Sequence, residues 1–385
     1  MTVIFCGGGK VHTLLEIIKE EIRESGPISF RRFVELSLFH PGHGYYSSGK
    51  ARIGKKGDFY TAPSVHRSFG ETISRFLAEA SLLLEGESFT VVEFGASGGQ
   101  LALDILEDLS RNHPGLYSKT DYVMSEASPV AVLAARKKLE GHSGKVRWID
   151  DLQEIGKNGF RGVVIANEFL DSLPFHRLRS DGEEIREIFL SLRNGEIEEV
   201  LRNPEAEGIY DFSKRYLEGY AQGEEAEVCL LAGKWLAEVG EALQKGFVLC
   251  IDYGSLAPEL YSPGRRKGTF RCFYRHELSS DPYTRVGEQD ITADVNFSEL
   301  MRVGDTLGLG TAKYTTQGQF LVDWGILEIF KTYDKPQNQG DRLAAKTLFM
   351  PEFMGRKFKV LLQSKDLSPE ELAELDKDRP FRIIL

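Results

Sequence analysis

Apolar runs of strand-forming residues alternate along this chain with amphipathic helical patterns. The clearest unit joins the apolar run 90–94, a cluster of small residues at 95–99 and a helical pattern from Gln100 to about Asn112. In that pattern the apolar residues recur at the three-to-four-residue spacing of one helix face. Small residues let a ligand approach the backbone, and a helix N-terminus offers free amide N–H groups. The unit therefore predicts a strand, a ligand-binding loop and a helix around which the other elements are arranged.

The same alternation continues on both sides of this unit. Strands are predicted over 121–126, 145–149, 162–166, 247–251 and 358–362. Helices are predicted over 11–24, 30–39, 69–84, 130–139, 234–245 and 294–307, with an acidic helical tail over 367–378. Alternating strands and helices are typical of a parallel sheet with helices on its faces. The pattern therefore predicts an α/β fold preceded by a helical N-terminal part.

Two long segments interrupt the alternation and are predicted to be insertions. The segment from about residue 176 to 227 contains β-prone runs separated by the turn signals Asp181-Gly182 and Asn194-Gly195. A polar stretch follows these runs. Residues 255–290 are rich in glycine, arginine and aromatic side chains. We therefore expect an N-terminal helical region with a Gly-Asp-Phe loop over 1–86, and a core with these two insertions over 87–385.

Composition narrows the classes of function. A chain of 385 residues with 41% hydrophobic and 28% charged residues is ordinary for a soluble enzyme, and its net charge of −10 argues against nucleic acid as the main partner. Neither the four separated cysteines nor the eight histidines show metal-ligand spacing, so we predict no metal site and a reducing compartment. No apolar run is long enough to span a bilayer, so we expect no membrane insertion. The expected location is the cytoplasm, or the mitochondrial matrix if the chain is eukaryotic.

Two cofactors use a loop of small residues between a strand and a helix. The dinucleotide pattern Gly-x-Gly-x-x-Gly fails at its second and third glycines, where the chain has Ser97 and Gln100. The residues Glu93, Gly95, Ser97 and Gly99 instead match Glu-x-Gly-x-Gly-x-Gly, the first signature of class I S-adenosyl-L-methionine (SAM) methyltransferases, with one glycine replaced. A tight turn that binds nothing is the alternative interpretation of this match.

Acidic residues stand at or near the ends of the first four predicted strands, where ligands bind in open α/β sheets. They are Glu93, Glu126, the pair Asp150 and Asp151, and the pair Glu168 and Asp171. A carboxylate that closes the second strand, Glu126, can accept hydrogen bonds from both hydroxyls of a ribose. A carboxylate after the third strand, Asp150 or Asp151, can bind an adenine amino group. The positions therefore favour SAM over a dinucleotide.

Further motifs occur in order along nearly the whole chain, over about residues 12–365. They are Gly57-Asp-Phe-Tyr-Thr-Ala-Pro63, Val92-Glu-Phe-Gly95, Glu126-Ala-Ser-Pro129, Ala166-Asn-Glu-Phe-Leu-Asp171, Ile251-Asp-Tyr-Gly254, Gly268-Thr-Phe-Arg271 and Asp290-Ile-Thr-Ala293. On these motifs the chain resembles the MidA-like methyltransferases, whose mitochondrial members are protein arginine methyltransferases that assist respiratory complex I assembly. One departure is Ser97, where the family usually has glycine. If its φ is positive, its Cβ costs energy and crowds the methionine moiety of SAM.

The resemblance implies a class I SAM-dependent methyltransferase with a Rossmann-like, mostly parallel seven-stranded sheet, a helical N-terminal part and insertions over the active site. It implies that SAM is the cofactor and that small-residue and polar positions of the motifs hold it. We assign to SAM the residues Thr61, Glu93, Gly95, Ala96, Gly99, Glu126, Ala127, Asp150, Asp151, Leu152 and Asn167. A homodimer is an expectation that rests on the resemblance alone.

We predict methyl transfer to a guanidinium nitrogen of a partner protein, and the resemblance implies a respiratory complex I subunit as that partner. A guanidinium stays protonated at ordinary pH, so the site needs carboxylates that hold its planar fork and accept a proton. The carboxylates expected to converge there are Asp58, Glu168, Asp171 and Asp252. A helix N-cap is the alternative role for Asp171, and a turn is the alternative for Asp252.

Two other functions remain open at this point. One is a non-catalytic assembly or binding protein that keeps a SAM-shaped pocket, which would hold cofactor without forming S-adenosylhomocysteine. The other is an NAD-dependent oxidoreductase, which the failed dinucleotide pattern makes weaker. Methylation of nucleic-acid bases is disfavoured, because the chain has Asn167-Glu-Phe-Leu where base amino-group methyltransferases have Asn/Asp-Pro-Pro-Tyr.

Overall fold

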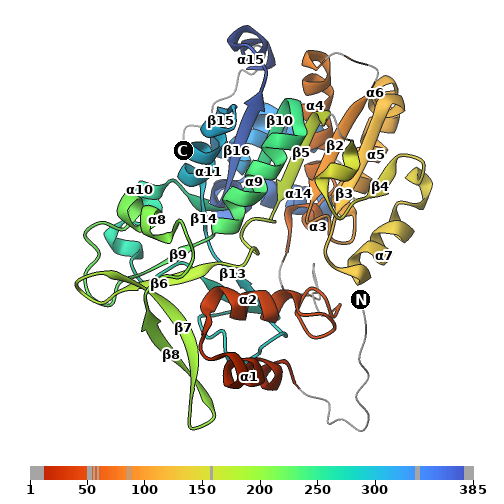
Figure 1. The fold of residues 1–385 in the computed structure, drawn as a ribbon. Helices are drawn as coiled ribbons and strands as arrows, with labels where there is room; N and C mark the ends of the chain where they lie inside the picture. Colours follow the sequence, from red (N-terminus) through yellow and green to blue (C-terminus); the bar gives the residue numbers. More distant parts are fainter. Residues whose placement is uncertain are drawn as a thin grey trace.

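The computed structural model describes residues 13–49, 54, 57–58, 60–84, 86, 88–156, 159–333 and 339–376. A large mixed sheet with helices on both faces forms one part, which is uppermost in Figure 1. Below it lies a second part made of the first two helices and two smaller sheets, and β8 projects from its lower edge. The functional site lies where these two parts meet.

The large sheet confirms the predicted α/β class. Along its main path the strand order is β15-β16-β10-β5-β2-β3-β4, and the short β14 pairs with the end of β10. The strands are β2 (Phe89–Phe94), β3 (Thr120–Ser125), β4 (Val146–Trp148), β5 (Phe160–Asn167), β10 (Leu243–Ser255), β14 (Val295–Asn296), β15 (Leu309–Thr316) and β16 (Phe358–Lys365). The run from β10 to β4 is parallel, whereas β16 is antiparallel to both of its neighbours. This is the Rossmann-like, mostly parallel sheet expected from the sequence.

Helices cover both faces because successive strand residues point to opposite sides. Val91 packs with the core under α4 and α5, whereas Val92 packs with the core under α9. The helices of this part are α3 (Ala62–Val65), α4 (Ser68–Leu83), α5 (Gln100–Asn112), α6 (Pro114–Lys119), α7 (Pro129–Lys138), α9 (Leu230–Ala242), α11 (Phe297–Thr306), α12 (Gln317–Asp323), α13 (Ile326–Thr332), α14 (Gln339–Phe349) and α15 (Pro369–Asp376). A π-helical turn, η5 (Pro351–Gly355), follows α14.

The second part joins the N-terminal helices to the predicted insertions. Its helices are α1 (Leu14–Ser25), α2 (Phe30–Phe39), α8 (Ile209–Tyr216) and α10 (Ala257–Leu260). One sheet holds β1 (Ile28–Ser29), β6 (His176–Ser180), β7 (Ile185–Arg193), β8 (Glu196–Arg202) and β9 (Glu225–Val228). The other holds β11 (Arg271–Tyr274), β12 (Glu277–Ser279) and β13 (Asp290–Thr292). Both turns predicted between β-prone runs are confirmed, because β6 pairs with β7 and β7 pairs with β8 across them.

Aromatic packing fixes the N-terminal helices against the insertions. The ring of Phe30 on α2 lies 5.8 Å from that of Phe175 and 5.7 Å from that of Phe270. The buried guanidinium of Arg177 lies 4.7 Å from the Phe30 ring and pairs with Glu199 and with a second carboxylate on β9. Removing one partner of such a buried ion pair typically costs about 3–5 kcal/mol. The domain division at residue 86 stays a prediction.

Candidate active site

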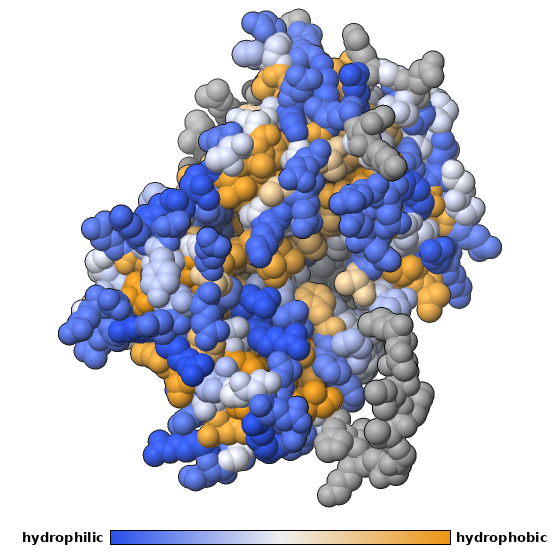
Figure 2. Space-filling model, viewed as in Figure 1, coloured by the Kyte–Doolittle hydropathy of each residue, from blue (hydrophilic) through white to orange (hydrophobic). Residues whose placement is uncertain are grey.

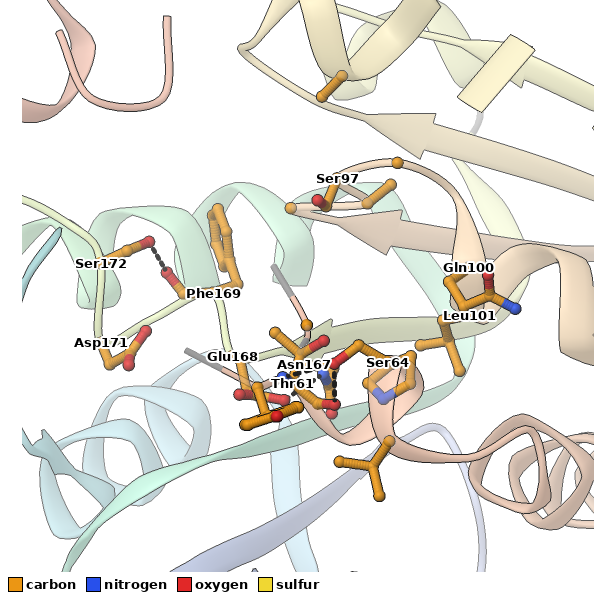
Figure 3. Close-up of a pocket in the computed structure, with 18 of the residues that line it drawn as sticks. Thr61, Ser64, Ser97, Gln100, Leu101, Asn167, Glu168, Phe169, Asp171 and Ser172 are labelled. Carbon is orange, nitrogen blue, oxygen red and sulfur yellow. Dashed lines mark hydrogen bonds between the residues drawn. The ribbon is translucent and has the colours of Figure 1, made fainter. Parts of the chain in front are cut away.

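A cavity of about 1860 Å³ lies at the carboxyl ends of the parallel strands, between the two parts of the molecule. Its lining comes from the loop after β2, the ends of β3 and β5, the residues before α3, and α14. On the face of the molecule shown in Figure 2, most of the surface is hydrophilic and the hydrophobic residues gather in small groups. Figure 3 shows the loop after β2 and the loop after β5 facing the same space.

The loop after β2 turns through three residues with left-handed backbone. Gly95 has φ 66°, and a Cβ placed there would come within 3.1 Å of the Phe169 ring, so the position favours glycine. Ser97 has φ 47°, and Gly99, with φ 73°, begins α5 without a side-chain cap. The predicted turn is confirmed. The φ of Ser97 is positive, which is the case in which we expect its Cβ to cost energy and to crowd the methionine moiety of SAM. The strained loop lets the α5 N-terminus face the cavity.

Two carboxylates lie near this loop, and one of them binds it directly. The Ser97 N–H donates to Glu126 Oε2 at 2.7 Å, and the Ser128 N–H donates to Glu126 Oε1 at 2.7 Å. Burial raises the pKa of Glu126, and these backbone hydrogen bonds partly offset the rise. Glu93 lies deeper and accepts a hydrogen bond of 2.7 Å from the Tyr122 hydroxyl, and burial raises its pKa to about 8. Both carboxylates line the cavity.

The loop after β5 brings a third carboxylate to the cavity. Glu168 has φ 51°, and its N–H donates to the Ile251 carbonyl at 2.8 Å, which ties the turn to β10. Its Oε1 accepts from the Ala62 N–H at 2.8 Å and from Asn167 Nδ2 at 3.2 Å. Burial raises the pKa of Glu168 to about 8. In Figure 3 the side chains of Glu168, Asn167 and Thr61 lie together where α3 approaches β5.

Asp252 holds the loop after β5 in place through hydrogen bonds. It is fully buried, does not line the cavity, and its Oδ2 accepts from the N–H groups of Leu170 at 2.9 Å and Asp171 at 3.2 Å. The Tyr253 N–H donates to Asp252 Oδ1 at 2.8 Å. Asp252 therefore has the turn role that was the alternative interpretation of its sequence position. Burial raises the pKa of Asp252 to about 8. Its contacts are those of a positioning residue.

Asp171 follows Glu168 in the loop after β5. Its carboxylate lines the cavity, and burial together with the charges of Asp252 and Asp290 holds its pKa well above the usual range. Among the described residues, no N–H or O–H group donates to this carboxylate. Arg271 lowers the pKa through its charge, but its guanidinium pairs with Asp294.

Asp290, on β13, is a cavity carboxylate that we did not select from the sequence. It is 3% exposed and accepts a hydrogen bond of 2.8 Å from the Tyr46 hydroxyl. Burial raises its pKa to about 7. Its position in the matched motif Asp290-Ile-Thr-Ala293 was the signal available in the sequence.

Two adjacent tyrosines connect the N-terminal part to the site. The Tyr45 hydroxyl donates to Asp58 Oδ2 at 2.8 Å, just as Tyr46 donates to Asp290. The Tyr46 carbonyl accepts from Ser128 Oγ at 2.8 Å, so the same residue touches both ends of the cavity. The sequence pattern did not predict this role, because the segment before Tyr45 is rich in glycine and proline and forms no long helix or strand.

The other predicted site residues divide into two groups. Thr61, Ala96, Ala127 and Asn167 line the cavity together with Asp58, Glu93, Gly95, Glu126, Glu168 and Asp171. Gly99, Asp150, Asp151, Leu152 and Asp252 are not among the lining residues. Asp151 instead caps the short helix Leu152–Ile155, accepting from the Gln153 N–H at 2.8 Å. An adenine contact by Asp150, Asp151 or Leu152 stays a prediction.

The glycine-loop end of the cavity fits a ligand rich in hydrogen-bonding groups. Asn167 Oδ1 is buried and has no partner within the part of the chain that the structure describes. The first turn of α5, at Gln100 and Leu101, lines the cavity and is not capped by a side chain. Within the same described part, no three His, Cys, Asp or Glu side chains are grouped as metal ligands, and none of the helices combines the length and apolar character needed to cross a bilayer.

Comparisons with known proteins agree with this geometry. Residues 72–315 match the family model described as "Putative S-adenosyl-L-methionine-dependent methyltransferase". The chain is 27% identical to the human protein named "Protein arginine methyltransferase NDUFAF7, mitochondrial", over 90% of this chain and 82% of that one. It is also 27% identical to the homologue of that protein in Drosophila melanogaster, over 91% of this chain and 84% of that one.

Solved structures extend the likeness to nearly the whole fold. A protein from Burkholderia thailandensis, described as a "likely methyl transferase" bound to S-adenosyl-homocysteine, is 30% identical, and the match covers 94% of each chain with a TM-score of 0.84. A native structure of an uncharacterized protein from the same organism is 29% identical over 92% of each chain, with a TM-score of 0.81. The match to the first structure includes the fold around a bound product of SAM.

Proposed function

The chain belongs to the MidA-like family of SAM-dependent methyltransferases, with SAM as its cofactor, and we propose that it methylates an arginine side chain of a partner protein. The observation that carries the proposal is the chemistry of the two ends of one cavity. The glycine-loop end is defined by the loop and Glu126, and the acidic end by Glu168, Asp171 and Asp290, and all of these residues line the same cavity. When bound, SAM supplies an electrophilic methyl group.

The acidic end suits a guanidinium group better than a neutral acceptor. Burial raises the pKa of Glu168 to about 8 and that of Asp290 to about 7, so both carboxyls are largely or partly protonated at neutral pH in the free protein. A guanidinium placed among them favours their ionised forms and forms two parallel charge-assisted hydrogen bonds with one carboxylate. A neutral hydroxyl acceptor brings no positive charge, so it would not favour the ionised forms of these carboxyls. The site therefore favours a cation as the methyl acceptor.

The same carboxylates can take up the proton that the reaction releases. One N–H bond of the acceptor nitrogen must break as its bond to the methyl carbon forms, so a base is needed. Glu168 Oε1 is engaged by the Ala62 N–H, and no described group donates to Oε2. A pKa of about 8 suits a proton acceptor at neutral pH. We assign proton uptake to Glu168, and orientation of the guanidinium to Asp171 and Asp58.

The partner in this proposal is a protein, and its chemistry follows that of the relatives. The human and fly relatives are named as mitochondrial protein arginine methyltransferases. We propose a respiratory complex I-type subunit as the substrate, in the cytoplasm of a bacterium or in the matrix of a mitochondrion. A homodimer stays an expectation.

The test measures product and cofactor together. Purified protein is incubated with SAM and an arginine peptide or a complex I subunit, and mass spectrometry identifies the methylated residue while S-adenosylhomocysteine is quantified. We expect one methylated nitrogen per S-adenosylhomocysteine formed, with loss of both in Asp171→Asn. Asp211→Asn is the control, because this exposed carboxylate on α8 does not line the cavity. SAM binding without turnover on any arginine substrate would favour a non-catalytic binding protein, and methylation of another side chain would correct the acceptor.

A further inference from the structure

Exposed apolar side chains gather at the mouth of the cavity. Nine large hydrophobic residues of the described chain are exposed, and four of them line this cavity. They are Tyr60, Val130, Leu343 and Phe353, with exposed fractions of 44%, 50%, 65% and 47%. Isolated exposed apolar residues need no explanation, whereas a cluster next to a site marks a binding surface. Three of these residues, Tyr60, Leu343 and Phe353, are called the rim below.

The rim is continuous because its residues lie on neighbouring elements. Gly340, Leu343, Ala344 and Thr347 of α14 line the cavity, and their spacing places them on one face of the helix. The other face of α14 is buried in the core. This helix contacts both α3, which Tyr60 precedes, and the π-helical turn η5, which carries Phe353. The three rim residues therefore border one opening from adjacent elements.

The cavity is larger than a cofactor requires. Sites for drug-sized ligands measure roughly 300–1000 Å³, and this cavity has about 1860 Å³. Outside the glycine loop, its lining contains buried carboxylates and exposed apolar side chains. Such a space suits a chain segment that carries one cation inward and keeps apolar neighbours outside.

We propose that the rim docks an extended segment of the substrate protein in which the methylated arginine is flanked by apolar residues. The inference rests on the proposed arginine methylation and adds the sequence context of the substrate. Charge complementarity supports it, because Asp58, Asp171 and Asp290 attract a cation and repel an acidic neighbour. Leucine or phenylalanine beside the arginine would cover Leu343 and Phe353, which are otherwise in contact with water.

The test compares two peptides of equal length and charge. Each carries a single arginine and a fluorophore, and the arginine lies between leucines in one peptide and between serines in the other. Binding is measured by fluorescence anisotropy with S-adenosylhomocysteine present, and turnover is measured with SAM. We expect the leucine-flanked peptide to bind at least tenfold more tightly and to have a lower KM.

Variants assign this preference to the rim. The double variant Leu343→Ser with Phe353→Ser should bring the two affinities within about twofold of each other, with SAM affinity unchanged. Leu82→Ser is the matched control, since Leu82 is 72% exposed on α4 and does not line the cavity. The substituted positions are exposed, and thermal unfolding checks that each variant folds.

The possible results separate this inference from the proposed function. Equal binding of the two peptides, or binding of neither, overturns the docking surface, while methylation of either keeps the proposed arginine reaction. Tight, rim-dependent binding without methylation keeps the docking surface and overturns the reaction. Sedimentation provides one more result that would overturn the inference: a dimer of the unaltered protein that the double variant dissociates would assign the rim to a second copy of the chain.

Discussion

The two ends of the cavity satisfy their carboxylates in different ways. At the glycine-loop end, Glu126 accepts two backbone hydrogen bonds, and Glu93 accepts one from Tyr122. At the acidic end, no described group donates to the Asp171 carboxylate. Burial and the charges of Asp252 and Asp290 raise its pKa. The carboxylates of the first end are held by hydrogen bonds, whereas the Asp171 carboxylate of the second lies among other carboxylates without a described donor.

This difference indicates what each end is built to bind. Carboxylates already fixed by hydrogen bonds, such as Glu126, suit neutral hydroxyl groups that need oriented acceptors. Buried carboxylates that repel one another, such as Asp171 and Asp290, destabilise the free protein and are relieved by a bound cation. The predictions below test whether cofactor affinity depends on the first end and methyl transfer on the second.

The largest expected effect is that of Asp171→Asn on catalysis. Loss of the carboxylate that holds the guanidinium should lower kcat/KM for an arginine peptide by about 10²–10⁴. SAM affinity should stay within about twofold of that of the unaltered protein, since Asp171 is not among the residues that we assign to SAM. The thermal midpoint should not fall, because the substitution removes a repulsive charge. Steady-state kinetics and titration calorimetry measure these quantities, and a parallel loss of SAM binding would contradict the division between the two ends.

The next largest effect is that of Glu126→Ala on cofactor binding. Hydrogen bonds to a charged group contribute about 1.5–3 kcal/mol each, so losing two weakens SAM binding by about 100-fold or more. The kcat value at saturating SAM should change little. Asp121→Ala is the control, because Asp121 opens β3 at the opposite edge of the sheet and pairs with Arg147. Calorimetric titration measures the SAM affinity of both variants. An unchanged affinity in Glu126→Ala would show that Glu126 only supports the Ser97 turn.

The pH dependence distinguishes the free acidic end from the occupied one. The pKa values of Glu168 and Asp290, raised to about 8 and about 7, mean that the folded protein binds more protons than the unfolded chain above pH 4.5. Stability of the free protein should therefore fall as pH rises from about 5 to 8. A cationic peptide binds the ionised carboxylates, so its KM should fall over about pH 6–8.5. Thermal midpoints across this range should vary less in Asp290→Asn, and an equally steep dependence there would exclude Asp290 as a contributor.

The sheet and the glycine loop could be predicted from the sequence because their signals are local. Apolar strands, the capping serine before α7 and the small residues at 95–99 lie within short windows, and the structure confirms the elements they predict. The edge strand β15 was missed, because only Leu309 in it is fully buried and the rest reads as polar. The helix expected from Asp294 begins at Phe297, since Asn296 caps it.

The meeting of several carboxylates at the acidic end could be predicted from the sequence only in part. Glu168 and Asp171 follow a recognised strand, so their position at the cavity follows from the topology of the sheet. Asp290 and Tyr46 are 244 residues apart and meet only because an insertion packs on the N-terminal helices. No spacing within one element encodes that contact. The rim was missed for the same reason, because Tyr60, Leu343 and Phe353 belong to three different parts of the chain.

The smallest expected effect is that of Ser97→Gly, and it tests whether the glycine-loop end is as complete as its hydrogen bonds indicate. A left-handed conformation costs an L-residue about 1–2 kcal/mol, and the greater freedom of glycine in the unfolded chain returns about 0.5–1 kcal/mol of that cost. With φ 47° at Ser97, the net gain in stability should therefore lie between about 0 and 1.5 kcal/mol. If the Cβ crowds the methionine moiety, SAM affinity should rise about two- to fivefold in Ser97→Gly. Ser97→Ala keeps the Cβ and removes the hydroxyl, so it should show no such rise.

An equal rise in both variants would place the effect on the hydroxyl. No rise in either would mean that Glu126, by binding the Ser97 N–H, already holds the serine turn in the geometry that SAM needs.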